Sequence, residues 1–478
     1  MIYSMKNNSS QNSNSAAFWD RDDELALLRS WQKRRPGLAV IHGRRRLGKT
    51  ALLRRWLREA DGLYVQATEG TPASQRESLA LDLQMGMPGF GDVVYPSWRA
   101  LLDALGRAWP SRSTVLVLDE FPYLARSSPE LPSLLQAMLD APTAERIPLV
   151  LCGSSQRMMQ GLVLDASAPL YGRAQCVLRL GPLPANVLGS ALGVGSNIAA
   201  VETYAAFGGV PRYWELMREG RYRSAEDALS DLVFSPHGVL HEEAERVLRD
   251  EEAAALEKAV CELVGRGARR PSEIAARLGV KVTTLSKPLR HLCQLHLLER
   301  NAPYDLREGR PEVATRRAFY RIADPFLAMW YACVRPYLSG LQVEAPAALQ
   351  HAREAWGQHV AAMWEGLCRE QWHRIGHDGV EWERAGRHWT SRQQTGDEWD
   401  VASVSADRRR VFLGECKWLR KVTQAKARSL VADIRSRQLP AAVDPSAVGL
   451  GLFLPDTSGL PRSIDRVALL GARRVMEA

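Results

Sequence analysis

The chain has 478 residues, of which 46% are hydrophobic and 24% are charged, so it can form several domains with ordinary globular cores. Its formal net charge of +9 favours an anionic partner such as nucleic acid or a nucleotide, although a generally basic composition would give the same charge. Seven scattered cysteines without a C-x-x-C pair indicate neither a disulfide framework nor a zinc site. No apolar run is long enough to cross a membrane, and we expect a cytoplasmic protein without a membrane partner.

The first part of the chain predicts a tail, a parallel sheet and a helical segment, in that order. Residues 1–17 are rich in Asn and Ser and lack the apolar run of a signal peptide, so we expect a disordered tail. Residues 18–183 alternate helical patterns with short apolar runs, which lie at 38–42, 63–67, 114–120, 148–154 and 176–180. This alternation predicts an α/β core whose parallel sheet is covered by helices on both faces. Helical patterns continue without strands through residues 184–250, which we expect to form a helical lid.

A phosphate-binding loop follows the first predicted strand. The stretch VIHGRRRLGKTALL places Gly43, Gly48, Lys49 and Thr50 in the pattern G-x-x-x-x-G-K-T, between a strand and a helix. In this pattern backbone N–H groups and the helix N-terminus bind phosphate oxygens, the lysine reaches the terminal phosphates and the threonine ligates magnesium. We therefore expect ATP and Mg²⁺ as cofactors.

The predicted strand at 114–120 ends in two acidic residues, Asp119 and Glu120. We expect Asp119 to hold the magnesium ion through water and Glu120 to polarise the attacking water. Because Glu120 supplies a base, the sequence favours hydrolysis of ATP over binding alone.

Six short motifs then occur in a characteristic order. They are FWDRDDELALL, IHGRRRLGKTALL, LDEFPYL, LCGSSQRMM, PLYGRA and GGVPRYW. In this order they resemble the prokaryotic ATPases often called the archaeal ATPase family, P-loop ATPases related to the AAA+ and STAND groups. The resemblance implies that Ser154 or Ser155 is a polar sensor at a strand end. It also implies that Arg173 is an arginine finger and Arg212 a second sensor, although either could equally be a surface or salt-bridge residue.

Residues 251–325 show the order of a winged helix-turn-helix: helix, Gly turn, helix, a further helix and an extended hairpin. The candidate recognition helix offers short polar and basic side chains, at Thr283, Thr284, Ser286, Lys287 and Arg290. These suit contacts to DNA phosphates and grooves, but the module could instead be a rigid packing block. The polar, Pro-containing stretch that ends residues 326–350 predicts a linker.

The last predicted domain, residues 351–478, contains two strands joined by a polar turn. Asp400 lies on the first strand, and Glu415 and Lys417 lie two residues apart on the second, so these two side chains share a face. One carboxylate from each strand can ligate Mg²⁺, and the lysine can orient water or stabilise a phosphate in the transition state. Acidic and basic residues also pair across hairpins for stability alone.

This hairpin, a preceding helix with Glu365 and the later apolar run VGLGLFLP resemble the PD-(D/E)xK nuclease superfamily. The resemblance implies an α/β restriction-endonuclease-like domain. In it Glu365 is the helix acid, Asp400 and Glu415 are the metal ligands and Lys417 is the catalytic base or stabiliser. We expect Glu398, an additional acid, to lie on the opposite face. A nuclease-derived domain that only binds or docks remains the alternative.

Taken together, the sequence predicts an ATPase that acts on or is regulated by nucleic acid, with DNA as the favoured partner, and that carries a Mg²⁺-dependent nuclease domain. One alternative is an ATP-gated signalling switch with an inactive docking domain, and another is a transcription factor with an ATP sensor. An arginine finger that acts in trans requires a neighbouring subunit, so a homo-oligomer is expected if Arg173 has that role.

Overall fold

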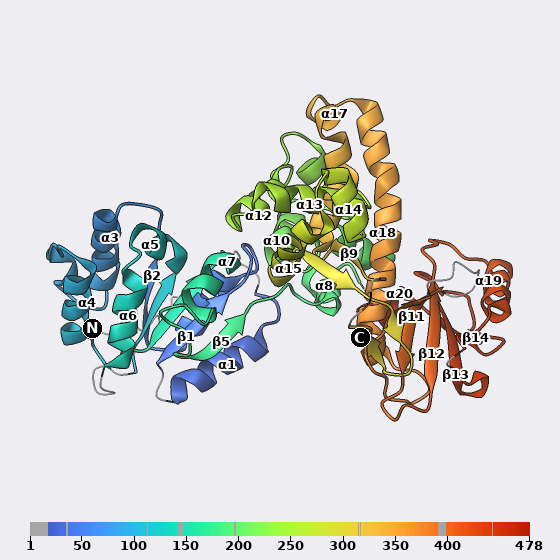
Figure 1. Ribbon diagram of the computed structural model, residues 1–478, viewed down its shortest axis with the longest axis horizontal. Helices are drawn as coiled ribbons and strands as arrows, with labels where there is room; N and C mark the ends of the chain where they lie inside the picture. Colours follow the sequence, from blue (N-terminus) through green and yellow to red (C-terminus); the bar gives the residue numbers. More distant parts are fainter. Residues whose placement is uncertain are drawn as a thin grey trace. The chain divides into compact units, whose positions relative to one another are not determined.

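The computed structural model divides the described chain into two compact units (Figure 1). It describes residues 18–34, 37–111, 113–141, 147–195, 197–313, 315, 317–390, 398–441 and 443–478. The predicted disordered tail lies outside these residues. The first unit ends at Pro182 but also includes Val247–Glu252, and the second contains Leu183–Arg246 and Ala253–Ala478. The predicted boundary at residue 250 falls within the returning segment.

The first unit is built on a parallel sheet with the strand order β2-β3-β4-β1-β5. The strands are β1 (Leu38–His42), β2 (Gly62–Gln66), β3 (Val115–Asp119), β4 (Leu149–Gly153) and β5 (Ala174–Arg179). Each predicted strand is present within two residues of its predicted bounds. β1, β3 and β4 are buried along their whole length, which explains their continuous apolar runs.

Helices precede and connect these strands. They are α1 (Asp22–Lys33), α2 (Lys49–Leu57), α3 (Pro72–Gln84), α4 (Trp98–Ala108), α5 (Phe121–Ser127), α6 (Leu131–Asp140) and α7 (Gln156–Met159), with the short turns η1 (Phe90–Asp92) and η2 (Gln160–Leu164). One apolar cluster joins α3, α4, α5 and α6 to the sheet. Because β4 lies between β1 and β3, the carboxyl ends of all three meet at one edge, where ligands bind in open α/β sheets.

The second unit begins with the helical segment that the sequence predicts. Its helices are α8 (Ala185–Leu192), α9 (Ile198–Phe207), α10 (Pro211–Glu219), α11 (Ala225–Leu229) and α12 (Glu243–Asp250), with the π-helical turn η3 (Ser230–Phe234). The end of α12 belongs to the first unit.

Next come three helices and a pair of strands in the predicted order. They are α13 (Ala255–Gly265), α14 (Pro271–Leu278), α15 (Ser286–Gln294), β6 (Leu298–Asn301) and β9 (Phe319–Ile322), with the short elements η4 (Val282–Leu285), β7 (Tyr304–Asp305) and β8 (Arg310–Pro311). β6 and β9 pair antiparallel. Pro288 lies in the first turn of α15, where its missing N–H is tolerated.

The segment predicted as a linker is largely helical. It contains α16 (Pro325–Met329), η5 (Trp330–Val334), η6 (Arg335–Tyr337), α17 (Leu338–Gln342) and the start of α18 (Pro346–Ile375). The linker prediction fails in the first half of this segment, where Phe326, Met329 and Trp330 are apolar and fully buried. This burial stabilises helical structure there. In the described part of the chain no helix is both long and apolar enough to span a membrane.

A second α/β sheet ends the chain, with the order β10-β11-β12-β13-β15-β14. Its elements are β10 (Gly386–Trp389), β11 (Glu398–Val404), β12 (Val411–Cys416), α19 (Gln424–Ser436), η7 (Pro445–Ala447), β13 (Val448–Phe453), β14 (Ser463–Ile464), β15 (Val467–Leu470) and α20 (Ala472–Met476). β11 and β12 are antiparallel, whereas β12, β13 and β15 are parallel. Helix α18 packs Trp372 on Phe412 at 3.7 Å, and α19 packs on the other face, against Leu413.

Candidate nucleotide and carboxylate sites

The loop between β1 and α2 has the backbone that phosphate binding requires. Gly43 and Gly48 have φ of +153° and +88°, and a side chain on Gly43 would meet the Leu180 carbonyl. The buried Lys49 donates to the carbonyl oxygens of Gly43 at 2.7 Å and Arg44 at 3.1 Å. Burial lowers the Lys49 pKa although acidic neighbours oppose this, and a bound phosphate would favour the charged form.

The two predicted magnesium-binding residues are in direct contact. The Thr50 hydroxyl donates to Asp119 Oδ2 at 2.7 Å, and Asp119 is fully buried at the end of β3. The Tyr64 hydroxyl, from the neighbouring strand β2, donates to the same oxygen at 2.7 Å. Burial and then the Asp119 charge raise the Tyr64 pKa, so this hydroxyl stays protonated and keeps donating. Two hydroxyl groups therefore fix the position of one carboxylate where a magnesium ion would be held.

Glu120 is engaged by the end of strand β4. The Ser154 hydroxyl donates to Glu120 Oε1 at 2.5 Å, and the Ser154 N–H donates to Oε2 at 3.1 Å. Glu120 also has a φ of +55°, which costs a non-glycine residue free energy and marks a backbone held by its surroundings. Ser154 thus lies at the strand end where a polar sensor is expected, and in this arrangement both oxygens of the predicted base are occupied.

The two predicted functional arginines form ion pairs. Arg173 makes a double contact with Asp140, at 2.9 Å through Nε and 2.7 Å through Nη2. In the second unit Arg212 pairs with Glu215 and Glu219, each at 2.9 Å. Their roles as arginine finger and second sensor stay predictions.

In the second sheet, the two strand acids lie opposite one another. Val401 pairs with Gly414 in the antiparallel ladder of β11 and β12, and the next register position places Asp400 beside Glu415. The Cys416 N–H donates to Asp400 Oδ2 at 2.9 Å. Burial and the charges of Glu365 and Glu415 raise the Asp400 pKa to about 6. The three predicted acids therefore interact electrostatically.

Two positively charged side chains neutralise Glu415. Lys417 Nζ lies 2.6 Å from Oε1, and Arg437 Nη1 lies 2.7 Å from Oε2. Burial opposes ionisation, but the hydrogen bonds from Arg437 and Lys417 lower the Glu415 pKa below its usual range. Glu415 is therefore an ionised carboxylate held on both sides.

The two other acids of this region, Glu365 and Glu398, contact arginines. Glu365, on α18, lies 3.8 Å from Arg369 Nη1. Arg387 lies 2.5 Å from Glu398 and 4.0 Å from Asp400, so Glu398 lies on the Asp400 side of the strand. The sequence-based expectation of the opposite face is wrong, because residues two apart in a strand share a face.

The chemistry of these donors suits a hard divalent cation. Among the described residues, no group of three or more His, Cys, Asp and Glu side chains is arranged to hold a metal ion. Carboxylate oxygens are nevertheless the ligands that Mg²⁺ prefers, and a cation would relieve the repulsion that raises the Asp400 pKa. Asp400 and Glu415 are thus the residues that would bind it.

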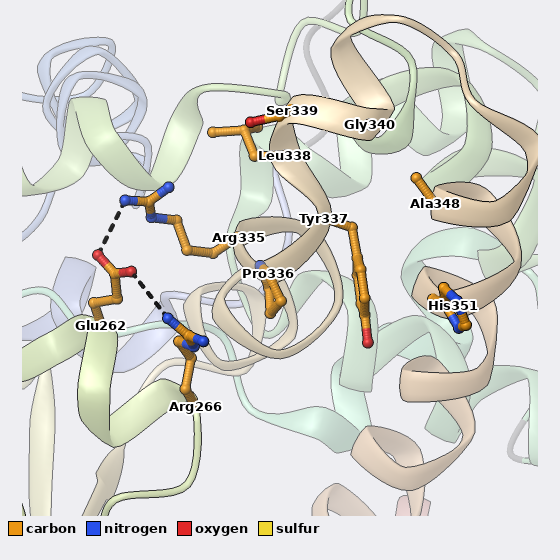
Figure 2. Close-up of a pocket in the computed structure, with 10 residues that line it drawn as sticks. All are labelled: Glu262, Arg266, Arg335, Pro336, Tyr337, Leu338, Ser339, Gly340, Ala348 and His351. Carbon is orange, nitrogen blue, oxygen red and sulfur yellow. Dashed lines mark hydrogen bonds and ion pairs between the residues drawn. The ribbon is translucent and has the colours of Figure 1, made fainter.

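A separate surface pocket of ≈ 500 Å³ lies beside α13, α17 and α18 (Figure 2). Glu262 lies there between Arg335 at 3.1 Å and Arg266 at 3.6 Å. Tyr337 stacks on His351 with 5.6 Å between ring centroids. None of the predicted site residues lines this pocket, and its central charges already form ion pairs.

Comparisons with known proteins identify the first part of the chain. Residues 18–216 match the family model described as an ATPase domain predominantly from Archaea. This segment is a P-loop ATPase domain. Residues 330–430 match a model of archaeal and bacterial proteins of unknown function.

One solved structure supports the same fold, and two further proteins are similar to parts of this chain. The Walker-type ATPase PABY2304 of Pyrococcus abyssi is 19% identical with a TM-score of 0.51, and the match covers 68% of this chain and 99% of that one. The ORC2 protein of Aeropyrum pernix is 16% identical over 73% of this chain and 98% of that one, with a TM-score of only 0.46. Uncharacterized protein MJECL04 of Methanocaldococcus jannaschii is 25% identical over 407 residues, or 84% of this chain and 87% of its own length.

Sequence reasoning missed Tyr64 in the ATPase domain and Arg437, which follows α19 and contacts Glu415 in the second sheet. Tyr64 reads only as an apolar strand residue, and Arg437 lies 22 residues from the acid that it contacts. Neither has a local motif, because each acts through a contact made by the folded chain.

Proposed function

We propose that the protein is an ATPase that acts on nucleic acid, in the first place DNA, and that its C-terminal sheet carries a Mg²⁺-dependent nuclease site. The nuclease proposal is carried by one observation. Asp400 lies opposite Glu415 on the neighbouring strand, and Lys417 contacts the carboxylate of Glu415. We retain the predicted division into an ATPase core at 18–183, a lid at 184–250, a winged helix at 251–325 and a nuclease-like domain at 351–478.

In the ATPase domain, each residue has a distinct task in hydrolysis. The loop from Gly43 to Gly48 would surround the phosphates, and Lys49 would bind the terminal ones. Thr50 and Asp119 would hold magnesium, which neutralises charge on the phosphates when bound. Glu120 would orient the attacking water once Ser154 releases it.

In the second sheet, this chain's own residues would prepare a phosphodiester for attack. Asp400 and Glu415 would bind the cation, which supplies electrostatic stabilisation when present, and Glu365 keeps its predicted role as the helix acid. Lys417 would hold a phosphate oxygen or orient water, since its ammonium already lies beside the acids. The Glu415 charge raises the Lys417 pKa although burial opposes this, so the side chain acts as a cation.

One further feature favours action on nucleic acid, and a second links the predicted lid to the nuclease-like domain. The candidate recognition residues are all exposed, namely Thr283, Thr284, Ser286, Lys287 and Arg290. Arg420, three residues after Lys417, contacts Glu202 on α9 at 2.5 Å and Glu226 on α11 at 3.0 Å. This ion-pair network joins the predicted lid to the loop that follows the nuclease motif.

The test is cleavage of linear, circular and single-stranded DNA and of RNA, with Mg²⁺ or Mn²⁺ and with or without ATP. Lys417→Ala is the key variant, and Lys421→Ala, an exposed lysine in the same loop, is its matched control. We expect cleavage by the wild type and the control but not by Lys417→Ala. Cleavage that persists equally in all three would refute the site.

A second candidate is an ATP-gated switch whose C-terminal domain only docks. It is favoured by one observation, since Lys417 and Arg437 together satisfy both oxygens of Glu415 without a metal ion. Intact ATP hydrolysis with no cleavage of any substrate would support this candidate.

A further inference from the structure

A short acidic segment from outside the matched ATPase domain packs beside the nucleotide site. Asp250 ends helix α12 and Glu251 and Glu252 directly follow it, more than thirty residues after the end of the matched region. They belong to the first compact unit, although the residues before Val247 and after Glu252 belong to the second. We call residues 250–252 the acidic segment.

Glu251 binds the loop that carries Ser154. It is 1% exposed, and its Oε2 accepts hydrogen bonds from the N–H groups of Gln156 at 3.0 Å and Arg157 at 3.4 Å. These residues begin α7, two and three positions after Ser154. Burial raises the Glu251 pKa, and the hydrogen bonds from Arg157 and Gln156 oppose this. A buried carboxylate of this kind needs those donors, so it fixes the position of the loop.

The neighbours of Glu251 attach the acidic segment at other points of the ATPase domain. Asp250 lies 3.3 Å from Arg45 in the phosphate loop. Glu252 lies 2.5 Å from Arg126 on α5, and its carbonyl accepts from Arg157 Nη1 at 2.8 Å. The segment therefore contacts both the phosphate loop and the loop that holds Ser154.

The contacts form a short chain from Glu251 to the predicted base. Glu251 holds residues 156 and 157, and Ser154 in the same loop holds both oxygens of Glu120. A general base needs a free oxygen that faces the attacking water. Ser154 donates to both oxygens of Glu120 and so restrains how this carboxylate faces the water, until Ser154 moves or exchanges its partner.

We propose that Glu251 is a positioning residue for ATP hydrolysis that keeps Ser154 on Glu120 until ATP binds. The terminal phosphate of ATP competes for the Ser154 hydroxyl, and the loop shift releases Glu251 from the N–H groups of α7. Because the acidic segment is joined at both ends to the second unit, its release reports the nucleotide state to the rest of the chain. This inference rests on the proposed role of Glu120 as the base.

The first test compares the steady-state kinetics of Glu251→Ala and Glu251→Gln in the full chain. Without Glu251 the loop holds Glu120 less firmly, so we expect kcat of the alanine variant to rise at least threefold. KM for ATP should not rise, because ATP no longer has to displace this contact, and the affinity for fluorescent ADP should stay within twofold. Glutamine keeps one acceptor oxygen for the N–H groups, so its kcat should lie closer to wild type. Glu245→Ala, an exposed acid on the same helix, is the control.

A structural role alone gives a different pattern. If Glu251 only supported the fold, the alanine variant would lose ADP binding, and that result would overturn the proposal. An unchanged or lowered kcat with normal ADP binding would also overturn it, as would a glutamine variant as active as the alanine one. Glu120→Gln, measured alongside, separates the two ideas, because wild-type hydrolysis by this variant would reject Glu120 as the base.

Hydrogen–deuterium exchange of the wild-type protein provides a second test, which does not depend on whether a variant folds. We expect residues 154–158 and 247–252 to exchange at least threefold faster with a non-hydrolysable ATP analogue than with ADP. Equal exchange with both nucleotides would overturn the proposed release even if Glu120 proves to be the base.

Discussion

Replacing Arg437 by glutamine is expected to strengthen divalent-cation binding at Asp400 and Glu415. Arg437 donates to Glu415 Oε2 at 2.7 Å, and Lys417 takes the other oxygen at 2.6 Å. A cation that binds Glu415 must therefore displace one of these two partners or share an oxygen with it. Glutamine retains much of the side-chain length but removes the competing charge.

The magnitude follows from the strength of the displaced contact. A hydrogen bond to a charged group contributes about 1.5–3 kcal/mol. The Arg437 side chain is 25% exposed, so solvent screens part of the attraction, and we take about 1.4 kcal/mol. This corresponds to about a tenfold gain in affinity.

Isothermal titration of the full chain with Mn²⁺ at pH 8 measures this gain. At pH 8 Asp400 is ionised, because its raised pKa of about 6 lies well below this pH. Arg435→Gln is the matched control, since it removes the same charge from an exposed position at the end of α19, the helix that Arg437 directly follows. Adding Asp400→Asn to the Arg437 variant should abolish the gain and so assign it to this site.

Two results would refute the reasoning. Unchanged or weaker Mn²⁺ binding by the Arg437 variant would show that the guanidinium does not compete with the cation. An equal gain in the Arg435 variant would show that net charge, rather than the contact with Glu415, sets the affinity.

Three further predictions concern other parts of the chain. Arg173→Ala should lower ATP turnover without weakening ATP binding if this residue is an arginine finger, and equal loss of both would reject the role. Gly209→Ala should destabilise the protein to urea by about 2 kcal/mol or more, because the new Cβ would lie 1.8 Å from the Leu183 carbonyl oxygen, and wild-type stability would contradict this close approach. Burial lowers the His359 pKa from 6.5 to about 4, so the unfolded state gains the proton first and stability falls as the pH drops below 6.5. Between pH 7.5 and pH 5 this histidine should cost about 2 kcal/mol of unfolding free energy, and His359→Gln should lack that share of the pH dependence in urea titrations; an identical pH dependence would exclude it.

The ATPase core is predictable because its information is local. Lys49 and Thr50 follow β1 in one strand–loop–helix unit, and Asp119 ends an apolar strand, so their order alone places them at one edge of a parallel sheet. The apolar runs also fix the strands, since buried parallel strands have little choice of pattern.

The sequence-based predictions fail or miss a residue where the structure depends on contacts between residues far apart in the chain. The linker prediction follows a polar, Pro-containing stretch and neglects the apolar run around Trp330, which becomes helical because it is buried. Glu251 and Arg437 have unremarkable local sequences, and only the folded chain brings them to Gln156 and Glu415. A single sequence contains no signal for such pairs, because many arginines and acids could form them.

Both candidate sites share one electrostatic feature, which suggests how each is controlled. Ser154 occupies both oxygens of Glu120, and Lys417 with Arg437 occupies both oxygens of Glu415. Each carboxylate is thus stable without its ligand, because a buried charge without partners would be costly. A phosphate group is the natural competitor in both cases, since it attracts the Ser154 hydroxyl in one site and the two cations in the other. In the second sheet, a nucleic-acid phosphate that draws Lys417 and Arg437 away would free Glu415 for a metal ion. Substrate and metal would then promote each other's binding, so the acids would be assembled for cleavage only when a phosphodiester is present.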